Sequence, residues 1–309
     1  LVLKVYYDRD PYEVTYKITG DIIPAGITVP TTKEYEWGTT VDVEAVLAVD
    51  GYVFYGWFTD DATVESNQFE MPAYDVEFVG YFVKERANYK IEHYVMDTEG
   101  NYPTDPTESY EQSGDVGDEV TASYITTFLN VVPATSHADT VLKGTIVSNK
   151  NGDELVLKLY YERIVKKVTY EYTGTIPTNA PAVPAEKEYY AGSTVKVEEV
   201  PTLSGYSFNG WISQDASITN GEFTMPATDV VLKGSFVASE GTIYKVEHYL
   251  EDDTGYTLKE TTQHAGTTDT EANAIPGSYP SYTHNPDHPD AKESGIRAFK
   301  IICENHYVY

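Results

Sequence analysis

The sequence predicts a mainly β protein, with little helix, built as a tandem array of small modules. The first observation behind this prediction is a repeated phrase, because residues 51–57 recur at 205–211, which is 154 positions later. Self-similarity at a fixed spacing is typical of repeat architectures. The second observation is that apolar residues alternate with a period of two, whereas the 3.6-residue period of helices is scarce. The shared residues of the phrase form a structural signature: Gly51, Tyr52, Phe54, Gly56 and Trp57, repeated as Gly205, Tyr206, Phe208, Gly210 and Trp211.

Each repeat unit contains two modules of about 75 residues, near the lower size limit for independent folding. After Val83 the spacing between matching residues rises from 154 to 155, which marks a linker that tolerates an insertion. We therefore expect an opening segment at 1–10, an A module at 11–86, a B module at 87–163, a second A module at 164–239 and a second B module at 240–309. We refer to these modules as A1, B1, A2 and B2.

The opening segment repeats the end of B1. Leu1–Arg9 reads Leu-Val-Leu-Lys-Val-Tyr-Tyr-Asp-Arg, and Leu155–Arg163 reads Leu-Val-Leu-Lys-Leu-Tyr-Tyr-Glu-Arg. We expect the opening segment to be the last strand of an earlier B module in a longer array. B2 has no clear copy of this strand, and Asp269 stands there where B1 has Gly117.

Three strands of the A module show inward-facing apolar positions. Two of them are short runs around Val14 and around Val41. The third predicts one core-facing side that is apolar in both copies, formed by Val76, Phe78, Gly80 and Phe82 and by Val230, Leu232, Gly234 and Phe236.

The signature phrase has a packing interpretation. Gly56 is expected to allow a β-bulge, so that Trp57 joins Phe54 in the core. The alternative is that Trp57 and Trp211 form an exposed platform for a carbohydrate or a protein partner.

In the B module, we expect a strand from Lys90 to Val95, followed by a turn over Asp97–Gly100. The closing strand should place Leu155, Leu157 and Leu159 on one face.

Composition excludes several classes of partner. The chain has 21 basic and 49 acidic residues and a formal net charge of −28, which repels nucleic acid and anionic membrane surfaces. The sequence contains no run of about 18 apolar residues, so insertion into a membrane is not predicted. The single cysteine, Cys303, rules out an intramolecular disulfide framework, and its place in an apolar alternation with Phe299 and Ile301 favours a buried, inert thiol over a reactive one.

Several polar clusters suggest chemistry, but each has a simpler structural explanation. The segment 282–290 contains His284, Asp287, His288 and Asp290, yet its two prolines favour a surface loop over a metal site. His93 and His248 are expected to be exposed cross-strand histidines rather than catalytic groups. Residues 149–154 favour an Asn-Gly turn over a calcium loop.

Cross-link and catalytic chemistry are also disfavoured. Lys33 and Lys187 each precede a glutamate, but neighbouring residues of a strand face opposite sides, which argues against an isopeptide site. No nucleotide-binding, hydrolase or zinc-protease motif is present. We therefore expect no enzyme activity, cofactor or metal.

The A modules resemble the Listeria-Bacteroides repeat, the family that includes the internalin B-repeat. The residues that carry the resemblance are the Val-Thr-Tyr strand at 14–16, the turn at 38–41, the signature phrase and the strand at 75–80. The B modules look like mucin-binding (MucBP-like) repeats, through Tyr89–Tyr94 and 114–117. The resemblance implies β-grasp-like modules in adhesins attached to the cell wall of Gram-positive bacteria.

Repetition favours a mechanical or binding role over catalysis, because reach and avidity scale with copy number. The main expectation is an extracellular stalk, monomeric within a longer chain; strands of ten residues give modules of roughly 33 Å, so that four in line approach about 130 Å. The alternative is that the B modules bind host glycans or glycoproteins through exposed tyrosines, namely Tyr102, Tyr124, Tyr256 and Tyr282.

Overall fold

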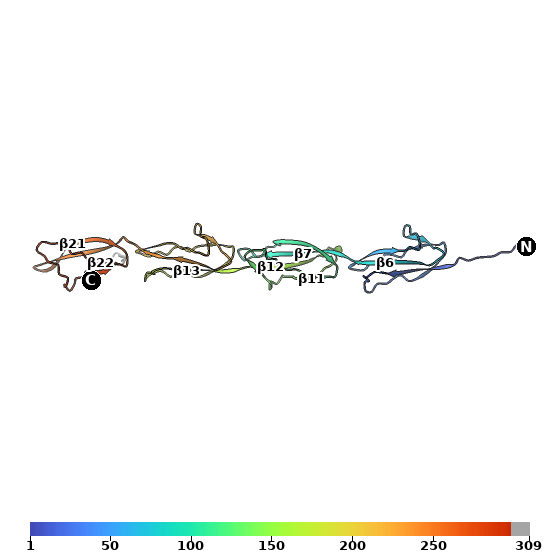
Figure 1. The fold of residues 1–309 in the computed structure, drawn as a ribbon, viewed down its shortest axis with the longest axis horizontal. Helices are drawn as coiled ribbons and strands as arrows, with labels where there is room; N and C mark the ends of the chain where they lie inside the picture. The colour runs from blue at the N-terminus through green and yellow to red at the C-terminus, as the bar shows by residue number, and fades with distance from the viewer. Residues whose placement is uncertain (298–309) are drawn as a thin grey trace. The chain divides into compact units, whose positions relative to one another are not determined.

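The computed structural model describes residues 1–297 and is almost entirely β (Figure 1). Its only helical element in that range is a single 3₁₀ turn, η1 (Asn149–Asn151). The chain divides into two compact units, Leu1–Asp97 with Asn101–Glu162 and Thr98–Gly100 with Arg163–Tyr309. The mainly β, tandem fold class is confirmed. The predicted Cys303 environment lies outside the described residues.

A1 is built on a four-stranded sheet in the order β2-β1-β6-β4. β1 runs parallel to β6 at the centre, while β2 and β4 are antiparallel to their neighbours. Val14, Val76 and Phe78 are buried on one face, against a small β3–β5 ladder that adds Val41 and Phe69. The strands are β1 (Pro11–Ile18), β2 (Lys33–Glu36), β3 (Thr40–Asp42), β4 (Tyr52–Phe58), β5 (Gln68–Glu70) and β6 (Val76–Lys84).

A2 repeats this plan with a more broken sheet. β13 pairs with β14 antiparallel and with β18 parallel, and Val168, Val230 and Leu232 form the core. The last strand is interrupted at Ser235, which leaves β16 and β19 as a separate pair. The strands are β13 (Val165–Tyr172), β14 (Lys187–Tyr190), β15 (Thr194–Lys196), β16 (Tyr206–Phe208), β17 (Glu222–Thr224), β18 (Val230–Gly234) and β19 (Phe236–Ala238).

B1 has a sheet in the order β10-β12-β7-β8. Its first and last strands, β7 and β12, again run parallel at the centre, in a register that sets Leu157 beside Ile91 and Tyr161 beside Val95. Leu157, Leu159 and Tyr161 are buried on one face, as the alternation predicts. The strands are β7 (Arg86–Val95), β8 (Glu108–Asp115), β9 (Glu119–Thr121), β10 (Val131–Pro133), β11 (Lys143–Thr145) and β12 (Leu155–Arg163).

B2 has a long hairpin where B1 has a sheet. β20 pairs with β21 along its length, with a bulge between His248 and Tyr249. Within residues 1–297 no strand pairs with the other edge of β20. The strands are β20 (Thr242–Asp252), β21 (Gly255–Gly266), β22 (Glu271–Asn273) and β23 (Ser294–Ile296).

The parallel pairing of first and last strands fixes the chain path through A1, A2 and B1. Two parallel strands need a crossover, so the residues between them travel back across the module before the last strand begins. The chain therefore enters such a module at one end and leaves at the other. One residue, Glu85, separates β6 from β7, and Ile164 alone separates β12 from β13.

The opening segment differs from its copy in B1. Leu1–Asp10 forms no strand, and its apolar side chains are exposed. No strand of the described residues pairs with this segment, whereas β12, which differs from it at two of nine positions, is buried where β7 lies beside it.

Candidate functional site

The signature phrase lies in the core of each A module. In A1 the bulge between Phe54 and Trp57 coincides with Gly56 at φ 106°. Trp57 then packs edge-on against Tyr16 and Phe54, with ring centroids 4.9 Å apart in both pairs. The Trp57 indole N–H donates to the Ala45 carbonyl at 3.2 Å. Trp57 is thus a core residue whose ring is packed and whose indole N–H is hydrogen-bonded.

The second copy keeps this arrangement. Trp211 is buried, packs edge-on against Tyr170 and Phe208, and donates to the Glu199 carbonyl at 3.4 Å. Gly234 lies so close to Phe208 that a Cβ there would stand 2.1 Å from the ring. A glycine in the last strand is therefore required by the aromatic packing.

The predicted binding tyrosines of B1 are not brought together. Tyr124 packs edge-on against Tyr161 in the main core, at 5.2 Å between ring centroids. Tyr102 packs on the opposite face of the sheet against Tyr160 and His137, at 5.2 Å and 4.7 Å. Both side chains are half-buried, contrary to the exposure expected for them, because loops fold over both faces of the B1 sheet.

The predicted tyrosines of B2 are exposed and meet at one place. Tyr256 is paired with Glu251 across the tip of the β20–β21 hairpin, and the Tyr282 hydroxyl donates to the Glu251 carbonyl at 3.2 Å. His288 packs edge-on against Tyr256, with ring centroids 4.5 Å apart. The hairpin tip therefore carries two exposed tyrosines and an imidazole.

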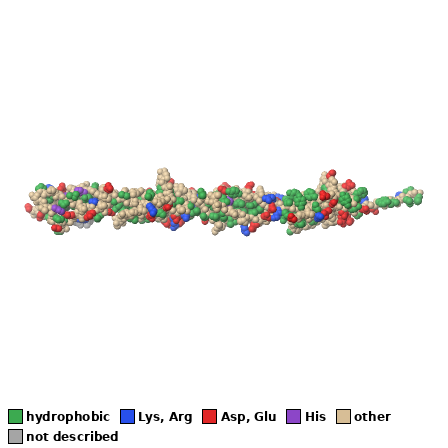
Figure 2. Space-filling model, in the orientation of Figure 1, with side chains coloured by type: hydrophobic (Ala, Val, Ile, Leu, Met, Phe, Trp, Pro, Cys, Tyr) green, Lys and Arg blue, Asp and Glu red, His purple; other side chains and the backbone are tan. Residues whose placement is uncertain are grey.

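An exposed aromatic ladder on A1 escaped the sequence analysis. On the outer face of β4 and β6, Tyr81 stacks against Tyr55 at 5.0 Å and against Phe58 at 6.0 Å. In A2 the residues 154 positions on from Tyr55 and Tyr81 are Asn209 and Ser235, joined by a 3.2 Å hydrogen bond. Figure 2 accordingly shows more hydrophobic side chains over A1 than over A2. The sequence signal that could have revealed this ladder is Tyr55, a position of the repeated phrase that is Asn209 in the second copy.

Glu85 is a buried acid at the A1–B1 junction. Its carboxylate accepts from the Ser148 hydroxyl at 2.7 Å and from the Lys150 ammonium at 2.8 Å. These bonds, with Lys150 contributing most, hold the pKa of Glu85 below its usual value. Its backbone N–H donates to the Gly51 carbonyl at 2.9 Å, and its own carbonyl accepts from the Val116 N–H at 2.8 Å. Sequence reasoning missed this residue because its partners lie more than 60 positions away.

The A2–B2 junction uses the same backbone bonds with different side chains. Ser239 N–H donates to the Gly205 carbonyl, and Thr268 N–H donates to the Ser239 carbonyl. Thr242 and Thr268 share a short buried hydrogen bond. Asp269, in the place of Gly117, adopts the same left-handed backbone at φ 59°, and its hydrogen bond from Tyr206 is the main cause that raises the pKa of that tyrosine to about 12.

The expectation that His93 is exposed was wrong. The imidazole is buried in B1, and its Nδ1 lies 2.8 Å from the Tyr161 hydroxyl, which itself accepts from the Ile125 N–H at 2.9 Å. Burial lowers the pKa of His93, and Glu108 opposes this in part. The error arose because Tyr110, Phe128 and Tyr161, from three different segments, pack around the imidazole. The neutral imidazole thus serves as a hydrogen-bonded core residue.

The other polar candidates lie in separate places. His284 pairs with Glu293, away from the Tyr256 ring that contacts His288. Lys33 pairs with Glu44 at 2.6 Å, and Lys187 pairs with Glu198, so each lysine has a carboxylate 11 positions on rather than the adjacent one. No group of three metal-ligating side chains occurs within the described residues. Residues 149–154 form a 3₁₀ turn that Ser148 caps and Gly152 ends.

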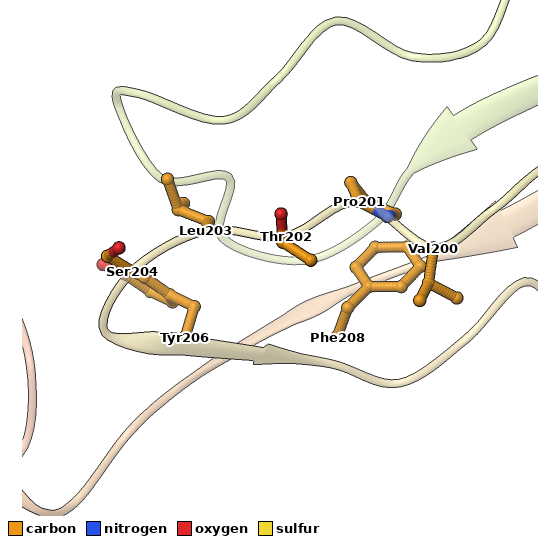
Figure 3. A pocket seen from close by; sticks show the side chains of 7 residues that line it. All are labelled: Val200, Pro201, Thr202, Leu203, Ser204, Tyr206 and Phe208. Carbon is orange, nitrogen blue, oxygen red and sulfur yellow. The ribbon is translucent and has the colours of Figure 1, made fainter.

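One open pocket lies in A2, beside the signature phrase. It is lined by Val200, Pro201, Thr202, Leu203, Ser204, Tyr206 and Phe208 (Figure 3). The lining carries no carboxylate, imidazole or amine, so it offers no pair of groups for acid–base chemistry.

No helix in the described part of the chain is long and apolar enough to cross a membrane.

The fold and the packed signature define a class: tandem β modules whose repeated residues are structural. The sequence model of the divergent InlB B-repeat domain matches residues 19–86 and 167–240, just under half of the chain. The resemblance of the A modules to the internalin B-repeat is therefore confirmed, while that of the B modules to MucBP-like repeats stays a prediction.

Comparison with solved structures gives a match to domains 3–4 of the Streptococcal High Identity Repeats in Tandem (SHIRT) of a cell surface protein. The match has 12% sequence identity and a TM-score of 0.20, and covers 74% of this chain and 99% of that one. No curated protein matches the chain.

Proposed function

We propose that this chain is a non-catalytic repeat region of a bacterial cell-surface adhesin, acting as an extended stalk. The observation that carries the proposal is the parallel pairing of β1 with β6, of β7 with β12, and of β13 with β18. Because each such module passes the chain from one end to the other, every added module adds length.

The short connections support the same role. A single residue between β6 and β7 leaves little freedom for bending, and Glu85 ties that residue to Ser148 and Lys150. The net charge of −28 supports an extended state through repulsion between modules. The match of both A modules to an internalin B-repeat supports an extracellular place on a Gram-positive cell, with attachment to the wall as part of the proposal.

Small-angle X-ray scattering tests the stalk. A rod of about 130 Å has a radius of gyration near 38 Å, whereas a compact globule of this length gives about 19 Å. We expect a value close to the first, measured at low protein concentration. A value near the second would contradict the proposal.

The second candidate function is binding of host glycans or glycoproteins by the B modules. The observation that favours it is the B2 hairpin tip, where Tyr256 and Tyr282 are both exposed and both placed by Glu251. Exposed aromatic rings next to hydrogen-bonding groups suit the mixed apolar and polar faces of sugars.

A glycan and mucin binding screen on the full chain tests this candidate. We expect the double substitution Tyr256→Ala with Tyr282→Ala to abolish binding. Tyr74→Ala serves as the control, because Tyr74 is an equally exposed tyrosine in A1. Binding that survives the double substitution would contradict the tip as the site.

A further inference from the structure

One face of the A1 sheet packs on the core, and the other face is turned to solvent. On the solvent face, β4 and β6 carry a continuous strip of apolar side chains, because every second residue of a strand points the same way. Tyr55 is 56% exposed and Phe58 is 50% exposed, and the Tyr81 ring stacks on both. This strip, which we call the aromatic strip, consists of Val53, Tyr55, Phe58, Val79, Tyr81 and Val83.

The tyrosine hydroxyls of the aromatic strip are not used by the protein itself. Among the described residues no hydrogen bond involves the hydroxyl of Tyr55 or of Tyr81, whereas the exposed Tyr74 donates to the Asp61 carbonyl at 3.0 Å. A continuous exposed apolar surface with unused polar ends is typical of an interaction surface.

The other half of the same face is acidic. It is formed by β1 and β2, where Glu13 stands directly opposite Glu34, and like charges at opposite positions destabilise a sheet. Within residues 1–297 no ion pair involves Glu13, Glu34 or Glu36, whereas Lys17 pairs with Glu77 at 2.5 Å. Figure 2 shows acidic side chains among the hydrophobic ones of A1. The solvent face thus combines unpaired carboxylates with exposed rings.

The same face of A2 lacks both features. Lys167 stands opposite Glu188 there, in the places of Glu13 and Glu34. The strands of this face carry four glutamates and one lysine in A1, a net charge of −3, but two glutamates and two lysines in A2. Because A2 forms the same core, folding requires neither the rings nor the carboxylates. Four positions of the aromatic strip are polar in A2, namely Ser207, Asn209, Lys233 and Ser235.

The spacing between the carboxylates and the rings sets the length of a ligand. In the register of β1 and β6, Val14 lies beside Val76, so Glu13 lies level with position 75 and Tyr81 is six residues further along. Six residues of extended chain span about 20 Å. A segment of about eight extended residues therefore reaches from the carboxylates to the rings.

The charge and the rings together define the chemistry of the partner. A guanidinium group pairs with carboxylates and stacks on tyrosine rings, so arginine suits both halves of the face. The net charge of −28 attracts a basic segment from a distance. A neutral glycan would leave the carboxylates unpaired, and a second copy of A1 would bring a face of the same negative charge.

We propose that the solvent face of A1 binds one extended basic segment of a partner protein. Basic side chains of the segment lie at Glu13 and Glu34, and its apolar side chains lie on the aromatic strip. The segment supplies the positive charge that the two opposed glutamates lack. This role does not depend on the proposed stalk, because it needs only the A1 face within the chain.

The first test is isothermal titration calorimetry of the full chain with a synthetic peptide of about twelve residues, arginine-rich at one end and leucine-rich at the other. We expect one peptide to bind per chain, because A2 lacks the face. A peptide with glutamate in place of arginine should bind at least about tenfold more weakly, and salt should weaken the binding of the arginine peptide. Equal affinity for the two peptides, two bound peptides per chain or no binding would overturn the proposal.

The second test gives A1 the residues of A2, which a folded A module tolerates. Tyr55→Asn with Tyr81→Ser should weaken peptide binding by about tenfold or more, and so should Glu13→Lys. The matched control is Glu70→Lys, the same change of charge on β5, which belongs to the ladder on the core side of the sheet. This control should leave the affinity within about twofold.

Two results of the second test would contradict the proposed site. A loss of affinity in Glu70→Lys as large as that in Glu13→Lys would mean that the peptide follows the overall charge and not this face. Affinity that survives Tyr55→Asn with Tyr81→Ser would exclude the aromatic strip. Sedimentation equilibrium of the chain alone completes the test, because self-association that this double substitution abolishes would assign the strip to a second copy and overturn the proposal.

Discussion

Tyr94 and Tyr249 occupy the same position in the two B modules, yet one is buried and the other exposed. The sequences around them are close copies, Lys-Ile-Glu-His-Tyr and Lys-Val-Glu-His-Tyr. The difference lies in the neighbouring strand, because Tyr160 of β12 stacks on Tyr94, whereas in the described part of B2 β20 pairs with β21 alone. The environment of a residue in such a module is thus decided by a segment about 65 residues away.

The largest expected effect is on these two tyrosines. Tyr94→Ala should destabilise B1 by about 3 kcal/mol or more, because it removes a ring packed against Tyr160 in the interior. Tyr249→Ala should cost less than about 1 kcal/mol at low protein concentration. Hydrogen exchange of the β7 and β20 amides measures each module separately. Equal costs would show that burial by β12 does not matter.

The two junctions provide the second prediction. Glu85→Ala should cost about 1–3 kcal/mol at the A1–B1 junction, because it removes two hydrogen bonds to a buried carboxylate. Ser239→Ala should cost little, since Ser239 contributes backbone bonds to the A2–B2 junction. Exchange rates of the Glu85 and Val116 amides report the first change. A comparable loss of stability in Ser239→Ala would contradict the conclusion that the Glu85 side chain stabilises its junction and the Ser239 side chain does not.

Histidine protonation provides the third prediction. The pKa of His93 is lowered in the folded state, so the unfolded chain binds the proton more tightly and stability falls as the pH drops below the unfolded value of about 6.5. At pH 5.5 we expect B1 to lose at most about 1.4 kcal/mol relative to pH 7.5. Hydrogen exchange of the β7 amides at both pH values measures this loss of stability, and His93→Gln should remove the pH dependence. A B1 stability that is the same at pH 5.5 and pH 7.5 would contradict the prediction.

The smallest effect concerns the outer faces of the A modules. Giving A1 the residues of A2, with Tyr55→Asn and Tyr81→Ser, removes two exposed aromatic stacks and should cost about 1 kcal/mol or less. The reverse change in A2, Asn209→Tyr with Ser235→Tyr, should not destabilise that module. Thermal unfolding of both variants checks this. A loss above about 2 kcal/mol would mean that the ladder is part of the A1 core.

Much of the fold could be predicted from local pattern. The alternation placed the buried residues of 76–82 correctly and also Leu157 and Leu159, although Tyr160 on the opposite face is buried as well, and the Gly56 bulge was expected from the signature phrase. These features depend on neighbours within a few residues, which a sequence displays directly. The candidate sites were less accessible, because exposure of Tyr102 or His93 depends on segments folded over them from elsewhere.

By itself, the sequence determined the repeat, the period-two strands, the aromatic core of the A modules and the acidic surface, since each follows from residue type and spacing. The tertiary structure alone decided which strands run parallel, that Glu85 joins two modules, and that His93 is buried while Tyr249 is not. The physical reason is that burial and hydrogen bonding are properties of pairs of segments. A pattern along one strand does not reveal which strand lies beside it.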